Sequence, residues 1–383
     1  MTAPAHILRR GTTYYFRRKI PSHLRAQVGK EEIRKSLGTT DLNEAKARAS
    51  VEAAKLDQEF ARLRIERFTQ RQRSGSKPQA LQISELFTRW KGQRERPRTT
   101  VYDFAKAAQR FAALFPDLQV SMVEPHHMAT FRDSVLAEGV SAGTVRKQFG
   151  ALSAMLELAV NDALLPDNPA RGLRLAAQAG NPQKRAPFSG AELRAIFSTP
   201  IYRIGERPHG GAGPAAYWLP LLALYTGARL GELGALQVKD LREESGVKYL
   251  RLLTEHARAT HLIRRVPIHG DLLRLGFMQF VEMQRRSGQH ALFDELRADN
   301  KGKLTGNWSK WFARYLRTVA RVENPLKSFD SFRPNFVATC ARADIASDLV
   351  DALVGRAIHS RTEIPLTQLS TAIQSLSFDI GSQ

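Results

Sequence analysis

Two polar segments divide this sequence and limit what it can fold into. TQRQRSGSKPQA, at 69–80, and a second segment at 176–188 combine Gly or Pro with small, polar and basic residues, a composition typical of flexible linkers. A chain of 383 residues also exceeds what one hydrophobic core usually organises. We therefore expect three domains, at 1–68, 81–175 and 189–383.

The first domain has the pattern of a small sheet followed by a helix. Residues 7–19, ILRRGTTYYFRRK, predict a β-hairpin because Gly11 separates two β-prone runs, and EEIRKSLG adds a third strand. Residues 40–68 predict a long helix, with Asp41 and Glu44 at the spacing of a capping box.

This first domain is strongly basic. Its first fifty residues carry eleven Lys and Arg against four Asp and Glu. A basic sheet backed by a helix is one way to contact a DNA groove, although a solvated basic face explains the same charge. The residues expected to contact DNA on the sheet are Arg17, Arg18 and Lys19.

The second domain predicts a helical bundle. Four segments between residues 81 and 175 repeat apolar residues at three and four spacing. Gly139 is placed to end the third helix and Ser141 to cap the fourth. Arg146 and Lys147, near the start of the fourth helix, are candidate phosphate contacts, although a surface helix needs polar residues in any case.

The third domain predicts mainly helices around a small sheet. Apolar periodicity and turn residues separate the segments. The expected helices are 189–198, 215–225, 229–236, 271–287, 306–322, 331–343, 346–354 and 366–376, and the expected strands are KYLRLL and LIRRVPI.

The charge balance points to a polyanionic partner. The formal net charge is +21, from 58 Lys and Arg against 37 Asp and Glu, and nucleic acid is the commonest partner of such a chain. A single cysteine, Cys340, excludes an intrachain disulfide and fits a reducing cytosol. Neither a signal peptide nor an apolar run of membrane-spanning length is found, so we expect a cytoplasmic, nucleoid-associated protein of bacterial or phage origin.

The stretch WLPLLALYTGARLGEL is the most informative part of the chain. An apolar helix ends at Thr226-Gly227, and Arg229 begins the next helix. A guanidinium held at a helix start presents a rigid fork of donors that suits a phosphate. Arg229 and Glu232 also have the spacing of an ordinary ion pair on a helix surface.

Three later elements follow in an order that resembles the tyrosine recombinases, the phage-integrase family. TGARLGEL is similar to the family's first arginine motif, and ARATHLIRRVPI occupies the place of its catalytic-lysine hairpin. SFDSFRPNF stands where the family has His-x-x-Arg, and DALVGR where it has Leu-x-Gly followed by His or Trp. Residues 81–175 resemble the family's core-binding domain and the first fifty its basic arm-binding domain. The resemblance implies a multidomain, mainly α fold with small β-sheets.

The resemblance also implies which residues surround a scissile phosphate. Arg229 and Arg333 match the two arginines, Arg258 falls at the lysine position, and Arg356 replaces the final His or Trp. These enzymes use such cations to stabilise the transition state while a tyrosine attacks. The family needs neither a cofactor nor a metal, and none is expected here.

Three substitutions in this set depart from the family's proton-handling groups. Asp330 replaces the first histidine, and an anion about 4 Å from a phosphate costs on the order of several kcal/mol. Asp330 also has the character of a helix cap or of a partner for Arg356. Pro334 replaces the second histidine and is compatible with a first helical turn, but it cannot donate to phosphate. Arg258 keeps the charge but is a poor general acid.

The nucleophile is missing from its expected place. No tyrosine follows Tyr315, and Ser360 and Thr362 lack an evident activating base. We therefore expect a catalytically inactive DNA-binding protein, a pseudoenzyme that acts as a regulator or as a partner of an intact recombinase on a mobile element.

One alternative is an active recombinase with an atypical nucleophile or with a nucleophile from another subunit. Another is an idle remnant of a mobile element. Double-stranded DNA and further copies of the chain are the expected partners. The tyrosines considered for the first alternative are Tyr202, Tyr217, Tyr225, Tyr249 and Tyr315.

Overall fold

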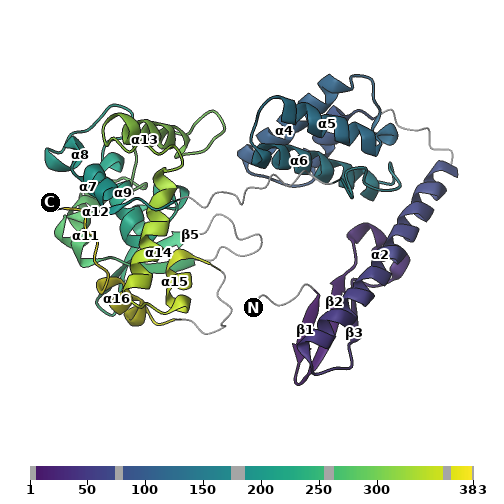
Figure 1. Ribbon diagram of the computed structural model, residues 1–383, viewed down its shortest axis with the longest axis horizontal. Coiled ribbons are helices and arrows are strands. Elements are labelled where there is room, and N and C mark those ends of the chain that lie inside the picture. Colours follow the sequence, from purple (N-terminus) through teal and green to yellow (C-terminus); the bar gives the residue numbers. More distant parts are fainter. Residues whose placement is uncertain (1–5, 74–80, 174–185, 254–262, 357–363, 382–383) are drawn as a thin grey trace. The chain divides into compact units, whose positions relative to one another are not determined.

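The computed structural model describes residues 6–73, 81–173, 186–253, 263–356 and 364–381. The chain forms two compact units, Met1–Ala179 and Gly180–Gln383, and both are mainly helical with one small sheet each (Figure 1). Within the described ranges, every helix is too short or too polar to span a lipid bilayer.

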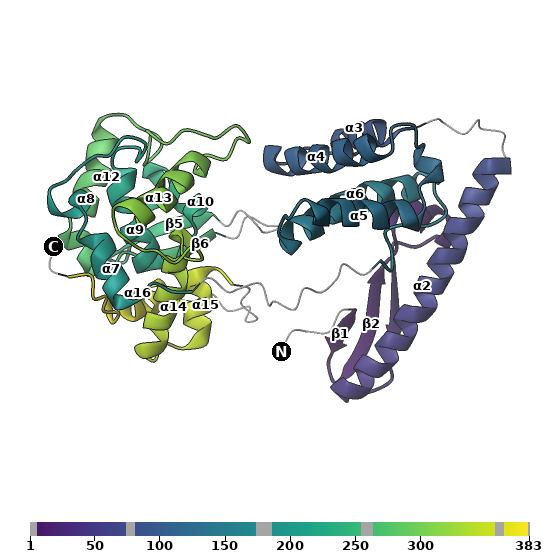
Figure 2. The ribbon, with the colours of Figure 1, turned by 45° about the horizontal axis from the view of Figure 1, so that its top comes forward.

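The N-terminal part of the first unit, residues 6–73, is here called the sheet module. Its antiparallel strands lie in the order β1-β2-β3, and Gly11 turns the hairpin with a φ of 59°. A long helix lies along one face of the sheet (Figure 2), because Phe16 and Phe60 bury their rings between them. The elements are β1 (Ile7–Arg10), β2 (Thr13–Lys19), η1 (Ser22–Leu24), α1 (Arg25–Val28), β3 (Glu32–Ser36) and α2 (Leu42–Arg73).

The start and end of α2 differ from the sequence prediction. Asp41 caps the helix as expected, since its Oδ1 accepts from the backbone N–H of Asn43 at 2.9 Å and of Glu44 at 2.8 Å. The Glu44 carboxylate does not complete a capping box, because it accepts from the Thr39 hydroxyl instead. At the other end the helix continues to Arg73, so residues 69–73 are helical and do not form a linker.

The second part of the first unit, residues 81–173, is here called the helical module. It contains the four predicted helices, and a core that includes Leu86, Phe111 and Phe131 lies between them. Ser141 caps the last helix through a bond from the Thr144 N–H at 3.3 Å, as predicted. The elements are α3 (Ile83–Gly92), α4 (Arg98–Leu114), η2 (Val120–Met122), α5 (Pro125–Ala137) and α6 (Ala142–Asn161).

Two arginines on α2 close the C-terminal end of α6. Arg67 donates to the carbonyl oxygen of Asn161 at 2.6 Å, and Arg71 donates to that of Asp162. The last carbonyls of a helix lack partners within it, so basic side chains stabilise this end by hydrogen bonds and charge. These contacts tie the sheet module to the helical module within one compact unit.

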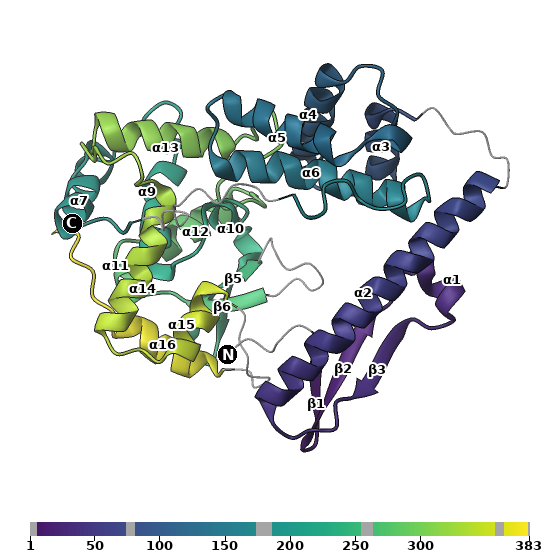
Figure 3. The ribbon, with the colours of Figure 1, turned by 45° about the vertical axis from the view of Figure 1, so that its right-hand side comes forward.

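The second unit surrounds a small antiparallel sheet of order β4-β5-β6 with helices. Strand β6 packs against two helices near the C-terminus, α15 and α16 (Figure 3). The elements are α7 (Gly190–Phe197), α8 (Pro200–Arg203), α9 (Ala215–Thr226), α10 (Leu230–Gly234), η3 (Val238–Asp240), β4 (Leu241–Glu244), β5 (Val247–Leu253), β6 (Ile263–Pro267), α11 (Gly270–Arg274), α12 (Phe277–Arg286), α13 (Gly306–Thr318), η4 (Phe329–Ser331), α14 (Phe332–Arg342), α15 (Ser347–Val354) and α16 (Leu366–Gln374).

Several elements in this unit differ from the prediction. The helix expected at 271–287 is broken into α11 and α12, because Gly276 adopts a φ of 87° that a helix interior cannot contain. The helix expected at 306–322 ends at Thr318. Strand β4 was not predicted, because its sequence LREE has one buried residue and lacks a clear apolar alternation.

Candidate phosphate site

The turn between α9 and α10 fixes the position of Arg229. Gly227 ends α9 with a φ of 64°, and a Cβ atom there would lie 2.6 Å from the Phe336 ring on α14. The turn and α14 therefore approach more closely than a side chain would allow. Arg229 follows as the N-cap of α10, in extended conformation, with 43% of its side chain exposed. Helix α10 has five residues rather than the eight expected, so the charge of the side chains, rather than a helix dipole, makes this site attractive to anions.

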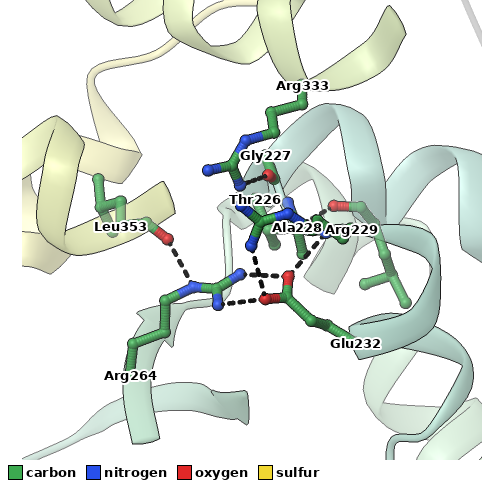
Figure 4. Close-up of polar contacts among 9 residues, drawn as sticks. Thr226, Gly227, Ala228, Arg229, Glu232, Arg264, Arg333 and Leu353 are labelled. Carbon is green, nitrogen blue, oxygen red and sulfur yellow. Dashed lines mark hydrogen bonds and ion pairs between the residues drawn. The ribbon is translucent and has the colours of Figure 1, made fainter. Parts of the chain in front are cut away.

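Arg333 reaches the same turn from α14. Its Nη1 donates to the carbonyl oxygen of Gly227 at 2.7 Å (Figure 4). Burial, followed by repulsion from Arg229 and Arg264, lowers the pKa of the Arg333 guanidinium to about 10. Arg333 thus remains a cation at neutral pH, and its charge lies in the same electrostatic environment as that of Arg229.

A buried ion pair lies beneath these two arginines. Glu232 has a side chain only 2% exposed, and Arg264 on β6 has one only 8% exposed. The Arg264 guanidinium binds the carboxylate in a bidentate manner, with Nη1–Oε1 at 2.8 Å and Nη2–Oε2 at 2.7 Å (Figure 4). Burial raises the pKa of Glu232, but the hydrogen bonds and charge of Arg264 outweigh it and the net shift is downward. Glu232 is therefore an ionised interior group and not part of a helix surface.

Sequence reasoning missed the role of Arg264. The motif around it was assigned through Arg258, which lies outside the described residues. A signal for Arg264 does exist in the sequence, because strand alternation places it on the same face as Val266 and Ile268, both buried.

Arg356, just after α15, pairs with Asp351 and not with Asp330, the partner that the sequence suggested. Its Nη1 lies 3.3 Å from Oδ1 of Asp351, and it is this carboxylate, not Asp330, that is its ion-pair partner. The side chain is 55% exposed, and its charge contributes to the lowered pKa of Arg333. Arg356 thus belongs to the electrostatic environment of the arginine pair.

Asp330 does not cap α14 as the sequence suggested. It lies inside the short 3-10 helix η4, which is capped by Ser328 and leads directly into α14 at Phe332. The exposed position of Asp330 places its charge at the surface of this turn. Pro334 is the third residue of α14, in the first turn, where the helix tolerates it as predicted.

Three of the tyrosines considered as nucleophiles, Tyr225, Tyr249 and Tyr315, are buried in the interior of the unit, and Tyr202 is partly buried. The Tyr225 hydroxyl donates to Asp271 at 2.9 Å, and burial followed by this bond raises its pKa. Burial likewise raises the pKa values of Tyr202 and Tyr315. Tyr249 is 6% exposed. Tyr217 is partly buried, and burial raises its pKa as well. None of these phenols has the environment of an activated nucleophile.

The three sheet residues predicted to contact DNA do not share one face. Arg18 turns toward α2, where Nη1 donates to Ala53 O at 3.0 Å and Nη2 lies 2.5 Å from Asp57. Arg17 and Lys19 lie on the opposite, open face, as the alternation of β2 requires. Arg17 pairs with Glu32 across the sheet at 2.8 Å, while Lys19 is exposed. By register, Arg10 and Arg34 also belong to the open face.

The two basic residues of α6 also differ from each other. Lys147 forms an ion pair with Asp103 on α4 at 2.5 Å. Arg146 is exposed and makes no ion pair with another residue in the described part of the chain. Arg146 is thus the better placed of the two to meet a phosphate. Across the same described ranges, no group of three His, Cys, Asp or Glu side chains could hold a metal ion.

Comparison with known proteins supports the overall fold. Residues 6–65 match a family described as a domain of unknown function, DUF6538. No curated protein matches the chain. Among solved structures, a lambda integrase tetramer bound to a Holliday junction aligns with a TM-score of 0.55 and 16% identity, covering 96% of this chain and 100% of that one.

Two further structures give similar results. A lambda integrase dimer bound to a COC' core site has a TM-score of 0.53 and 16% identity, covering 96% of this chain and 98% of that one. The XerH site-specific recombinase bound to a palindromic difH substrate has a TM-score of 0.50 and 16% identity. The alignment covers 67% of this chain and 73% of that one. The described elements therefore define a multidomain, mainly helical protein with a small sheet in each unit. Its fold is that of the tyrosine recombinases and integrases, as the sequence motifs predicted.

Proposed function

We propose that this protein binds duplex DNA, holds a backbone phosphate between Arg229 and Arg333, and does not cleave the strand. The arrangement of these two arginines around the Gly227 turn is the observation that carries the proposal. Both guanidinium groups are cations, and arginine forks bind phosphate oxygens with charge-assisted hydrogen bonds. Asp330, Pro334 and the absence of a tyrosine after Tyr315 argue against cleavage.

The solved relatives and the charge of the chain support the DNA-binding part of this proposal. The lambda integrase structures are bound to a core site or a Holliday junction, and the Tn1549 integrase structure to circular intermediate DNA. A net charge of +21 favours a polyanion whatever its sequence. We carry DNA binding over to this chain on both grounds.

We further propose how the parts of the chain share this function. The sheet module would contact DNA through its open face, and the helical module through the exposed Arg146. The C-terminal unit would grip the phosphate. Several copies of the chain would assemble on DNA. The protein would act as a regulator or as a partner of an intact recombinase, on a mobile element in the bacterial nucleoid.

The alternative is an active recombinase that receives its nucleophile from elsewhere. Three of the tyrosines considered as nucleophiles are buried and the other two are partly buried, which disfavours a nucleophile from the same C-terminal unit. A nucleophile from a second copy would give a covalent DNA adduct, whereas the proposed function gives none.

Fluorescence anisotropy with a labelled duplex tests the binding part. Log affinity should fall steeply with log salt concentration, because each neutralised phosphate adds about 0.9 to the slope. Arg229→Ala and Arg333→Ala should each weaken binding modestly and reduce the slope by about 1. Arg286→Ala is the matched control, since this 80% exposed arginine lies on α12 and pairs with Glu282. Undetectable binding at low salt, or affinity that does not change with salt, would contradict the proposal.

A further inference from the structure

One carboxylate is shared by two arginines at the base of the phosphate site. Each oxygen of Glu232 accepts two hydrogen bonds. Oε1 accepts from Arg264 at 2.8 Å and from the Arg229 side chain at 3.3 Å. Oε2 accepts from Arg264 at 2.7 Å and from the Arg229 backbone N–H at 2.7 Å. Both carboxylate oxygens thus have two donors each, and the Arg229 guanidinium makes only one hydrogen bond to Glu232, a long one of 3.3 Å.

We propose that Arg264 is a positioning residue that occupies Glu232 and so keeps the Arg229 guanidinium available for a DNA phosphate. This inference rests on the proposed function, because the ligand it serves is the phosphate of bound DNA. Arg264 is too deeply buried to contact DNA itself, so its role is to hold Glu232.

The charges explain why Arg264 is needed. A buried carboxylate without a partner is strongly unfavourable, so it draws in the nearest cation. With Arg264 in place, the bidentate geometry satisfies Glu232 from the interior side. Without Arg264, Arg229 is the arginine already in contact with Glu232 and would turn inward to form the fork itself. An inward Arg229 would no longer present its donors to a phosphate.

Arg264 also reaches the end of α15. Its Nε donates to the carbonyl oxygen of Leu353 at 2.9 Å. Gly355 follows with a φ of 71°, and a Cβ atom there would lie 3.0 Å from Nη1 of Arg264. The guanidinium therefore packs directly on the backbone that leads into Arg356. A single buried side chain thus contacts the supports of two of the arginines at the site.

Substitutions of Arg264 and of Glu232 test this role through their effect on DNA affinity. Arg264→Met should weaken binding about tenfold, the size of one lost charge-assisted hydrogen bond, and as much as Arg229→Ala does. Arg264→Met/Glu232→Gln should bind to within about twofold of the parent, because no buried charge remains to capture Arg229. In an Arg229→Ala background, Arg264→Met should have no further effect. Additive losses would overturn the proposal.

The matched control is Arg265→Met. Arg265 is the next residue of β6, faces the opposite side of the sheet and pairs with Glu244 at 3.0 Å. This variant should bind DNA as the parent does. If Arg264→Met does not fold, as judged by circular dichroism, the double variant and Arg264→Lys decide the question. A folded double variant that has lost binding would overturn the proposal.

A pH profile separates positioning from a merely structural role. Arg264 from β6, Arg229 from α10 and Arg333 from α14 are the charged groups that face Glu232. In Arg264→Met, the Arg229 fork keeps Glu232 ionised, so affinity relative to Glu232→Gln should stay low from about pH 8 to about pH 5 and recover only as Glu232 is protonated below its unfolded pKa of about 4.3. A profile parallel to that of Glu232→Gln would contradict the inference.

The accessibility of Arg229, measured without DNA, tests the role of Arg264 independently of whether the protein binds DNA. Phenylglyoxal labels accessible arginines, and peptide mass spectrometry can quantify the label on Arg229. Arg264→Met should lose Arg229 labelling relative to Arg265→Met, and Glu232→Gln should not. If the parent fails to bind DNA but this pattern appears, the proposed function fails and the positioning role stands. Equal labelling of Arg229 in all variants would overturn the positioning role.

Discussion

Nη1 of Arg333 donates to the carbonyl oxygen of Gly227 at 2.7 Å, and this bond joins α14 to the turn that carries Arg229. The two arginines lie 104 positions apart in the sequence, but one backbone contact fixes their relation in space. A preorganised pair of cations loses little conformational freedom when a phosphate arrives. The geometry of this turn should therefore control both stability and phosphate binding.

Gly227→Ala should destabilise the C-terminal unit by about 2–4 kcal/mol, since alanine opposes the left-handed conformation and its Cβ would overlap Phe336. Gly246→Ala is the control, because Gly246 has a φ of 75° but a Cβ atom there would meet nothing within 4 Å. It should cost only about 1 kcal/mol. Urea unfolding measures both, and equal losses would show that the close packing of the turn is unimportant.

Arg18→Ala and Lys19→Ala should separate stability from DNA binding in the sheet module. Arg18 lies over the Phe60 ring at 5.5 Å and bonds to α2, so its loss should reduce the unfolding free energy by about 1–2 kcal/mol. Lys19 is exposed on the open face, so its loss should leave stability unchanged and reduce the salt slope of DNA binding by about 1. The reverse pattern would mean that the face assignment of the sheet is wrong.

Glu232 should contribute to stability at neutral pH and lose this contribution in acid. Its pKa is lowered in the folded protein, so the stabilisation is present above the unfolded pKa of about 4.3 and is lost as pH falls through the folded value. Between about pH 5 and about pH 3, the parent should therefore lose more stability than Glu232→Gln. Glu244→Gln, at an exposed ion pair, is the comparison. Urea unfolding at several pH values checks this, and parallel curves for the parent and Glu232→Gln would contradict it.

Cys340 should report on unfolding of the C-terminal unit. Its side chain is fully buried in α14, and burial raises the pKa of the thiol to about 11. The thiol is thus protonated and shielded at neutral pH, and a disulfide reagent such as Ellman's should react only as fast as the unit opens. Gly227→Ala should accelerate this reaction and Gly246→Ala should do so less. Rapid labelling of the native parent would contradict the packing around α14.

The sequence predicted those parts of the site that lie in recognisable local motifs. Arg229 follows a helix-ending Thr-Gly pair, and Arg333 lies in the first turn of a helix whose Phe332, Phe336 and Cys340 recur at helical spacing. Arg264 was missed because the neighbouring arginines of LIRRVPI look alike until strand register decides which one faces the interior. The roles of Asp330 and Arg356 could not be assigned because they depend on a 3-10 turn and on an ion pair between Arg356 and Asp351 of α15. Both depend on where a short helix begins or ends, and the boundaries of helices are the least certain part of a sequence-based prediction.

A nicked suicide substrate tests the central claim most directly. Cleavage by a tyrosine route would leave the protein joined to DNA through a phosphotyrosine, and the nick would prevent religation. Incubation of the purified chain with such a duplex, followed by a denaturing gel, should show no adduct under conditions in which anisotropy shows salt-dependent binding. An adduct that resists denaturant, with the attached residue mapped by mass spectrometry, would contradict the claim and identify the nucleophile.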